Sequence, residues 1–157
     1  MVSDQMNFIH LSECALSEKR CEELISFFES NIDKARPGKA GIKNLPNLEL
    51  IIAINMTDSL TEPVKNYIRE YPLFETSLAS WNLDPCIHIC KFKPGKSYEK
   101  IHCENDGLKQ NQNRAFAWMI YLNDIQIGGE TEFIYQKFKT TPKAGNLYIW
   151  PSGATHM

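Results

Sequence analysis

The chain has 157 residues, the length of a single ordinary domain, with 43% hydrophobic and 23% charged residues. Seventeen Lys and Arg against nineteen Asp and Glu give a net charge of −2, which argues against the broad basic face that nucleic-acid binding requires. No apolar run approaches the ~20 residues of a membrane span. Neither a nucleic acid nor a membrane is therefore an expected partner.

The cysteine content and the N-terminus bear on the compartment. No basic segment followed by an apolar stretch opens the chain, so no secretory signal is expected. An odd number of cysteines without such a signal indicates reduced thiols and not a disulfide framework. We therefore expect a cytoplasmic protein. The five cysteines are Cys14, Cys21, Cys86, Cys90 and Cys103.

The first part of the chain is expected to be helical, with one strand. Ser17 is a good N-cap for a helix whose apolar face recurs at helical spacing. We expect that region to end at Pro37-Gly38 and Gly41, and a strand to follow over Leu48–Ile54. The face of this first helix comprises Cys21, Leu24, Ile25, Phe28 and Ile32.

A second helix is expected to start near residues 59–63, where Ser59 and Glu62 resemble a capping box and Pro63 fits a first turn. Its apolar stripe would consist of Val64, Tyr67, Ile68 and Tyr71.

From residue 86 onward the pattern is typical of short strands separated by turns. The predicted strands are Cys86–Phe92, Tyr98–Glu104, Ala115–Leu122, Thr131–Ile134, Phe138–Thr140 and Leu147–Trp150. The expected fold class is α+β: one domain over residues 1–157, with a helical support over about 1–80 and an antiparallel β-roll over about 85–157.

Two of the four histidines are interpreted as structural. His10 precedes the first helix with no acidic partner nearby. His88 alternates with Cys86 and Cys90, so a strand would place all three on one face. The two cysteines would be about 13 Å apart along the strand at ~3.3 Å per residue. A zinc ion with Zn–S bonds of about 2.3 Å cannot bridge them.

His102 and Glu104 form a more informative pair. Two residues apart on a strand, they would point to the same side, where an imidazole and a carboxylate can take adjacent positions on a metal. The facial triad of non-haem Fe(II) enzymes needs two histidines and one carboxylate. His156 can supply the second histidine, because the turn, the strand and the short loop before it would bring it to the mouth of the β-roll. The alternative interpretation of His156 is a frayed residue near the terminus.

Several motifs accompany this triad in a fixed order: His102-x-Glu104, Tyr121-Leu122-Asn123, Gly128-Gly129-Glu130-Thr131-x-Phe133, Pro142-x-x-Gly145-x-Leu147, and Trp150-Pro151 before His156. Together they resemble the 2-oxoglutarate/Fe(II)-dependent oxygenases, and within them the prolyl 4-hydroxylase-like branch. The resemblance covers residues 86–157 by motif. It implies a double-stranded β-helix, or jelly roll, that here would lack its last strands.

The resemblance also implies the site and the reaction. His102, Glu104 and His156 would bind Fe(II), and Tyr98 and Thr131 would lie at the 2-oxoglutarate. Oxidative decarboxylation with O₂ would release succinate and CO₂ and hydroxylate a C–H bond of a peptidyl, prolyl-like or small-molecule substrate, with ascorbate as a further cofactor. Tyr98 has an alternative interpretation as a core-lining aromatic. The aromatic residues expected in the core are Phe116, Trp118, Phe133 and Trp150.

The sequence departs from that family in two respects. Glu104 stands where aspartate is commoner. A basic residue that pairs with the far carboxylate of 2-oxoglutarate normally follows the last histidine, whereas here only Met157 follows His156. Lys100 and Arg114 are the candidates to replace it.

Three explanations of the short C-terminus are open: a truncated chain, a partner or second copy that completes the roll, or a metal site without the oxygenase reaction. The functional alternatives are accordingly a hydroxylase, a catalytically impaired metal-binding module, and an interaction β-sandwich without a metal.

Overall fold

The computed structural model describes residues 8–37, 47–54, 56–78, 80, 82–84, 86–98 and 100–157. Gly38 and Gly41, where the first helical region is expected to end, lie outside these residues. The helices are α1 (Glu18–Ser30), the 3-10 turn η1 (Ile32–Lys34), α2 (Thr57–Glu70) and α3 (Leu73–Ser77). The strands are β1 (His10–Ser12), β2 (Arg36–Pro37), β3 (Asn47–Ala53), β4 (Cys86–Phe92), β5 (Phe116–Ile120), β6 (Glu132–Phe133), β7 (Phe138–Lys139) and β8 (Leu147–Pro151).

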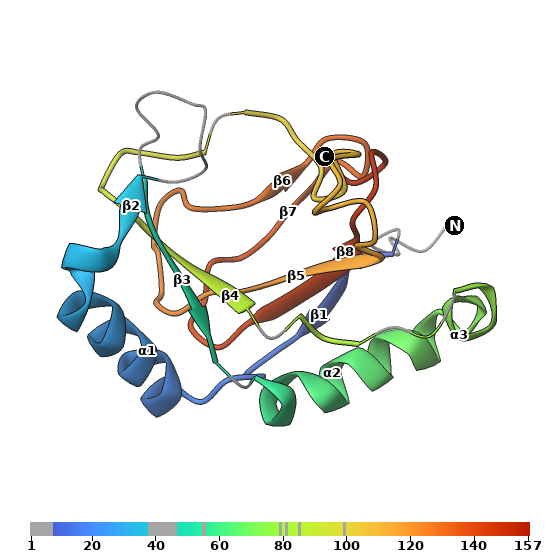
Figure 1. The fold of residues 1–157 in the computed structure, drawn as a ribbon, viewed down its shortest axis with the longest axis horizontal. Helices are drawn as coiled ribbons and strands as arrows, with labels where there is room; N and C mark the ends of the chain where they lie inside the picture. The colour runs from blue at the N-terminus through green and yellow to red at the C-terminus, as the bar shows by residue number, and fades with distance from the viewer. Residues whose placement is uncertain are drawn as a thin grey trace.

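The strands form two three-stranded sheets, in the orders β1-β8-β5 and β2-β3-β4, and the hairpin β6-β7. Every pairing is antiparallel. Helices α1 and α2 lie below the sheets in Figure 1, and the hairpin lies above them. The predicted α+β class is confirmed, but β1 and β3 from the first 80 residues join the sheets, so helical and β parts are interleaved in the chain. None of the described helices is long and apolar enough to cross a membrane.

Helix α1 begins as predicted. The Arg20 N–H donates to the Ser17 side-chain oxygen at 3.3 Å, which satisfies one of the helix's unpaired N–H groups. Cys21, Leu24 and Phe28 are buried. The apolar face ends there, because Ile32 lies in η1 and is 42% exposed.

The predicted N-cap of the second helix, Ser59, is wrong by three residues. Helix α2 begins at Thr57, and its N-cap Met56 makes no side-chain cap hydrogen bond. Ser59 is already inside the helix, where its N–H donates to the Met56 carbonyl oxygen at 3.1 Å. Glu62 forms an ion pair with Lys65 one turn later and does not reach back to a cap.

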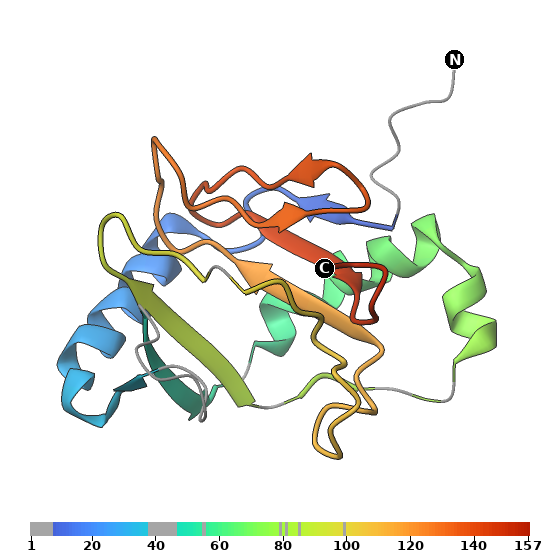
Figure 2. The same ribbon diagram turned by 90° about the horizontal axis from the view of Figure 1, so that it is seen from above.

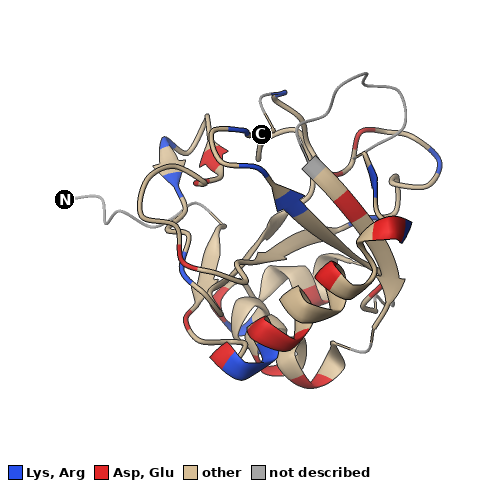
Figure 3. Cartoon of the chain, turned by 90° about the vertical axis from the view of Figure 1, so that its left-hand side faces the viewer, with Lys and Arg blue, Asp and Glu red and all other residues tan. Residues whose placement is uncertain are grey.

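The outer surfaces of the helices carry charges of both signs. In Figure 3, both Lys and Arg (blue) and Asp and Glu (red) occur over the helices. Some of these charged side chains form i, i+3 ion pairs within a helix: Arg20 with Glu23 at 2.9 Å, and Lys65 with Glu62 at 2.7 Å. Exposed pairs of this kind contribute little to stability, so the apolar faces of the helices provide most of it.

The core has two parts, on the two faces of β8. Leu147 and Ile149 pack with residues of the helices in the larger cluster. Tyr148 and Trp150 pack with Phe133 in a smaller cluster on the hairpin side. This alternation is the two-residue period of a strand that is covered on both faces. Of the four aromatic residues expected in the core, Phe133 and Trp150 are buried, and Phe116 and Trp118 are partly buried against the larger cluster.

One predicted strand is wrong. At its described residues, the segment Tyr98–Glu104 is irregular. Local contacts take the place of a ladder: the His102 Nδ1–H donates to the Lys100 carbonyl oxygen at 2.9 Å, and the Cys103 thiol contacts the Asn105 carbonyl oxygen at 3.1 Å. Such local bonds compete with strand pairing. The other predicted strands lie within two residues of the observed ends.

Both histidines interpreted as structural have carboxylate partners. His10 Nδ1 lies 2.7 Å from Glu70 of α2, so the expectation that it has no acidic partner is wrong. The two residues are 60 positions apart in the sequence, and the pairing of β1 with β8 brings His10 into contact range of α2. His88 on β4 contacts Glu49 on the neighbouring strand β3.

Gly145 allows a close approach between two chain segments. Its φ is +80°, and a Cβ at this position would collide with the Leu16 carbonyl oxygen. We predict that Gly145→Ala destabilises the protein by at least about 3 kcal/mol, because strained backbone and steric overlap add. Gly107→Ala is the matched control: its φ is also +80°, no atom lies within 4 Å of its added Cβ, and a loss of only ~1 kcal/mol is expected. Urea unfolding measures both, and equal losses would contradict the explanation.

Candidate metal and co-substrate site

His102 and Glu104 lie side by side even though their segment is not a strand. The distance between His102 Nε2 and Glu104 Oε1 is 3.4 Å. Nitrogen and oxygen ligands about 2.1 Å from one ion, at right angles to each other, are about 3 Å apart. The pair is therefore close to the arrangement of two adjacent metal ligands.

The surroundings of His102 fix its ring. Because the Lys100 carbonyl can only accept, the hydrogen bond to it requires the proton on Nδ1, and Nε2 is then the nitrogen with a lone pair. The Tyr98 ring packs against the imidazole, with centroids 4.6 Å apart. A metal-ligating histidine typically has this kind of support from its second nitrogen and its neighbours.

The carboxylate of Glu104 has a cationic neighbour as well. Arg114 Nη1 lies 3.2 Å from Glu104 Oε2, the oxygen that is not directed at His102. The side chains of Glu104 and Arg114 are 28% and 35% exposed. Their pairing follows from the loop over residues 105–114, whose end returns to the side chain of Asn105, the residue after Glu104.

His156 is a buried residue, 5% exposed, on the turn that follows β8. Its N–H donates to the Gly153 carbonyl oxygen at 3.0 Å. Its Nδ1 lies 2.9 Å from the Thr155 hydroxyl, and the Phe133 ring packs edge-on at 6.4 Å between centroids. Nε2 is therefore the nitrogen on which metal coordination would fall, and the frayed-terminus interpretation does not describe this side chain.

Main-chain contacts connect the two parts of the site. The Asn105 N–H donates to the Ser152 carbonyl oxygen at 2.8 Å, one residue after Glu104 and four residues before His156. Figures 1 and 2 both show the C-terminal end beside the segment that leads from β4 to β5. Ser152 is buried, and its hydroxyl donates to the Arg114 carbonyl oxygen.

The donor set of two imidazoles and one carboxylate suits non-haem Fe(II). In the described part of the chain, no three His, Cys, Asp or Glu side chains are arranged so that they could hold a metal ion. The structure thus brings His102 and Glu104 together in a geometry that fits two adjacent ligands. His156 as the third ligand stays a prediction.

The two residues expected at the co-substrate have different environments. Tyr98 lies against His102; partial burial raises its pKa, and the carboxylates of Glu104 and Glu49 raise it further, so the phenol stays protonated at neutral pH. Thr131 instead belongs to a polar cluster in which its N–H donates to Thr140 Oγ1 at 2.8 Å and to Tyr121 Oη at 3.2 Å.

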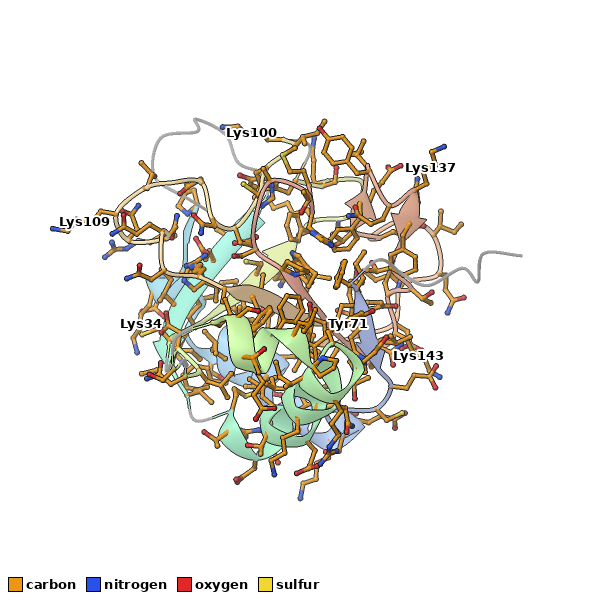
Figure 4. All side chains as sticks on the ribbon, turned by 90° about the vertical axis from the view of Figure 1, so that its right-hand side faces the viewer. Lys34, Tyr71, Lys100, Lys109, Lys137 and Lys143 are labelled. Atoms are coloured by element: carbon orange, nitrogen blue, oxygen red, sulfur yellow. The ribbon has the colours of Figure 1, made fainter. Side chains whose placement is uncertain are left out.

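The two candidates for a replacement cation also differ. Lys100 is exposed and projects from the upper edge of the molecule in Figure 4. Arg114 contacts the predicted iron ligand Glu104. Arg114 is a candidate cation from the sequence, but its contact with Glu104 is not predicted from the sequence. No sequence pattern indicates that Asn105 and Ser152 join the two parts of the site.

Asn105 is predicted to hold the 105–114 loop against the site. Its side-chain N–H groups donate to the Gln112 and Arg114 carbonyl oxygens at 3.1 and 3.3 Å. We expect Asn105→Ala to lower the free energy of unfolding by about 1–3 kcal/mol, because these carbonyls lose a partner, and to speed amide exchange across the loop. Asn113→Ala, at an exposed position of the same loop, is the control. Unchanged exchange in Asn105→Ala would contradict this role.

We compared the sequence and the structure of the chain with those of known proteins. No protein-family model and no curated protein matches the sequence. Solved structures do resemble the fold. One is a viral collagen prolyl hydroxylase from Paramecium Bursaria Chlorella virus-1, in a 2OG complex, at 20% identity and a TM-score of 0.61, covering 96% of this chain and 81% of that one. Another is a Pseudomonas putida prolyl-4-hydroxylase at 16% identity and a TM-score of 0.65, covering 94% of this chain and 81% of that one. The chain therefore has the fold of the prolyl hydroxylases.

Proposed function

We propose that the chain is an Fe(II)- and 2-oxoglutarate-dependent dioxygenase that hydroxylates a C–H bond. The observation that carries the proposal is the His102–Glu104 pair, whose nitrogen and oxygen are 3.4 Å apart in a chain with the prolyl hydroxylase fold. Fold similarity alone would not suffice, since one fold hosts many functions. The pair adds the donor chemistry that the reaction needs.

In this proposal, His102, Glu104 and His156 hold the iron. Bound Fe(II) would supply the site at which 2-oxoglutarate and O₂ react, with succinate, CO₂ and the hydroxylated substrate as products. The hydrogen bond to Lys100 keeps the His102 proton on Nδ1. The Tyr98 ring packs against the His102 imidazole and the Phe133 ring against the His156 imidazole, so each predicted histidine ligand has an aromatic neighbour.

The proposal also covers how the co-substrate is bound and which class of substrate reacts. Tyr98, which stays protonated, can donate a hydrogen bond to a carboxylate of 2-oxoglutarate, and Thr131 is proposed as a second contact. The strand arrangement is proposed to be that of a jelly roll. A prolyl-like peptide is the proposed substrate class, because the viral and the Pseudomonas putida structures that resemble this chain are prolyl hydroxylases. Ascorbate is proposed as an accessory cofactor.

One observation favours a second candidate, a metal-binding module that has lost the oxygenase reaction. Thr131 is already engaged: besides its backbone bonds to Tyr121 and Thr140, its hydroxyl lies 3.6 Å from the Met119 sulfur. A co-substrate contact through Thr131 would have to break this contact. The module would bind the metal through the same ligands without binding 2-oxoglutarate.

Anaerobic addition of Fe(II) and 2-oxoglutarate tests both candidates. We expect a visible charge-transfer band that needs both additions, followed by succinate when O₂ is admitted. His102→Ala and Glu104→Ala should abolish the band, because each removes one of two adjacent ligands. His10→Ala is the matched control: it removes a histidine with a carboxylate partner at a distant position and should leave the band intact.

The outcomes separate the candidates. Metal binding without the band or succinate would support the module and contradict the dioxygenase. Metal binding that His102→Ala leaves unchanged would contradict both.

A further inference from the structure

We propose that Arg114 is a positioning residue that orients the Glu104 carboxylate, with Oε2 held by its guanidinium and Oε1 presented beside His102. The inference rests on the proposed function, because it assigns to Arg114 a role in metal binding through Glu104. Arg114 itself is not a metal ligand: a guanidinium has only donors and stays charged.

The first observation is that the two oxygens of one carboxylate are directed at different partners. Oε1 lies 3.4 Å from His102 Nε2, and Oε2 lies 3.2 Å from Arg114 Nη1. The two oxygens of Glu104 therefore have different neighbours: Oε1 faces the imidazole of His102, and Oε2 faces the guanidinium of Arg114. A carboxylate held in this way would offer one oxygen to a metal and keep its second on the guanidinium.

The second observation is that the Arg114 backbone is fixed on both sides. Its N–H donates to the Asn111 carbonyl oxygen at 3.0 Å. Its carbonyl accepts from the Asn105 amide at 3.3 Å and from the buried Ser152 hydroxyl. The guanidinium therefore extends from a point that is tied to the residue after Glu104 and to the turn that carries His156.

A residue that positions Glu104 is useful because glutamate is a flexible metal ligand. Its side chain has three rotatable bonds, so an unrestrained Glu104 would lose more rotamer freedom on binding a metal than a restrained one. Neighbouring groups that restrain metal ligands commonly determine much of the affinity. Arg suits this role better than Lys, because its planar fork fixes a direction as well as a charge.

An opposing effect decides the design of the test. A cation close to Glu104 also repels a divalent metal, so its removal could tighten binding. Arg114 is 35% exposed, which lets solvent and salt weaken its repulsion of a metal on the far oxygen, whereas the hydrogen bond from Nη1 to Oε2 acts at contact distance and fixes a direction. We therefore expect orientation to outweigh repulsion. The two effects predict opposite signs, so the sign of the affinity change distinguishes them.

The experiment is a titration of the full chain with Co(II), followed by the visible absorption of the bound metal. Arg114→Gln should weaken Co(II) binding about tenfold or more and change the absorption spectrum. Arg114→Lys, which keeps the charge without the fork, should recover part of the affinity. Lys109→Gln is the matched control, since it removes an exposed positive charge of the same loop that projects outward, and should change the affinity less than about twofold. Thermal unfolding verifies that each variant is folded.

A double-mutant cycle with Glu104→Asp tests whether Arg114 acts through the carboxylate. The shorter side chain withdraws the carboxylate from the guanidinium, so Arg114→Gln should have a much smaller effect in that background. An equal loss in both backgrounds, or tighter binding by Arg114→Gln, would overturn the inference. A wild-type chain that binds no Co(II) would contradict the proposed metal function, and the inference with it, whereas wild-type binding that Arg114→Gln leaves unchanged would contradict the inference alone.

Discussion

The pairing of strand β8 on both of its edges is the interaction on which the fold and the candidate site depend. β8 lies between β1 and β5, and its residues from Leu147 to Trp150 are all buried. Buried main-chain groups need partners; β5 pairs with β8 from Leu147 to Pro151, and β1 pairs with it from Leu147 to Ile149. Its side chains alternate between the two parts of the core. One strand thus links the N-terminal segment, the helices and the hairpin.

The site is built directly at the end of this strand. Ser152, one residue beyond β8, donates its N–H to the Ala115 carbonyl oxygen at 3.1 Å and accepts from the Asn105 N–H. The end of β8 therefore fixes where the His102–Glu104 segment, the start of β5 and the turn with His156 meet. Each of these hydrogen bonds contributes only about 1 kcal/mol, but because they share one residue they restrain three segments together.

What could be predicted from the sequence follows from how local each interaction is. The α1 cap at Ser17 and the limits of β4 depend on neighbouring residues, and both are confirmed. The three-residue strand β1 carries almost no local pattern and exists because β8 offers it a partner. The start of α2 was predicted wrongly because Ser59 and Glu62 have cap-like spacing but lie inside a helix that tertiary packing extends.

The site shows the same division. The spacing of His102 and Glu104 correctly indicated that their side chains meet, but not for the reason expected, since their segment is irregular and not a strand. A hydrogen bond from the imidazole to the Lys100 carbonyl orients His102 instead. The contact between Arg114 and Glu104 depends on how a ten-residue loop closes, which no residue pattern encodes.

X-ray absorption at the iron edge can show whether His102, Glu104 and His156 bind one iron ion together, as proposed. The chain is loaded anaerobically with one equivalent of Fe(II) and 2-oxoglutarate, and imidazole ligands are counted from the multiple-scattering features of their rings. We predict two imidazoles in the wild-type chain and one in His156→Ala. An equal count in both chains, or no imidazole in either, would contradict the claim.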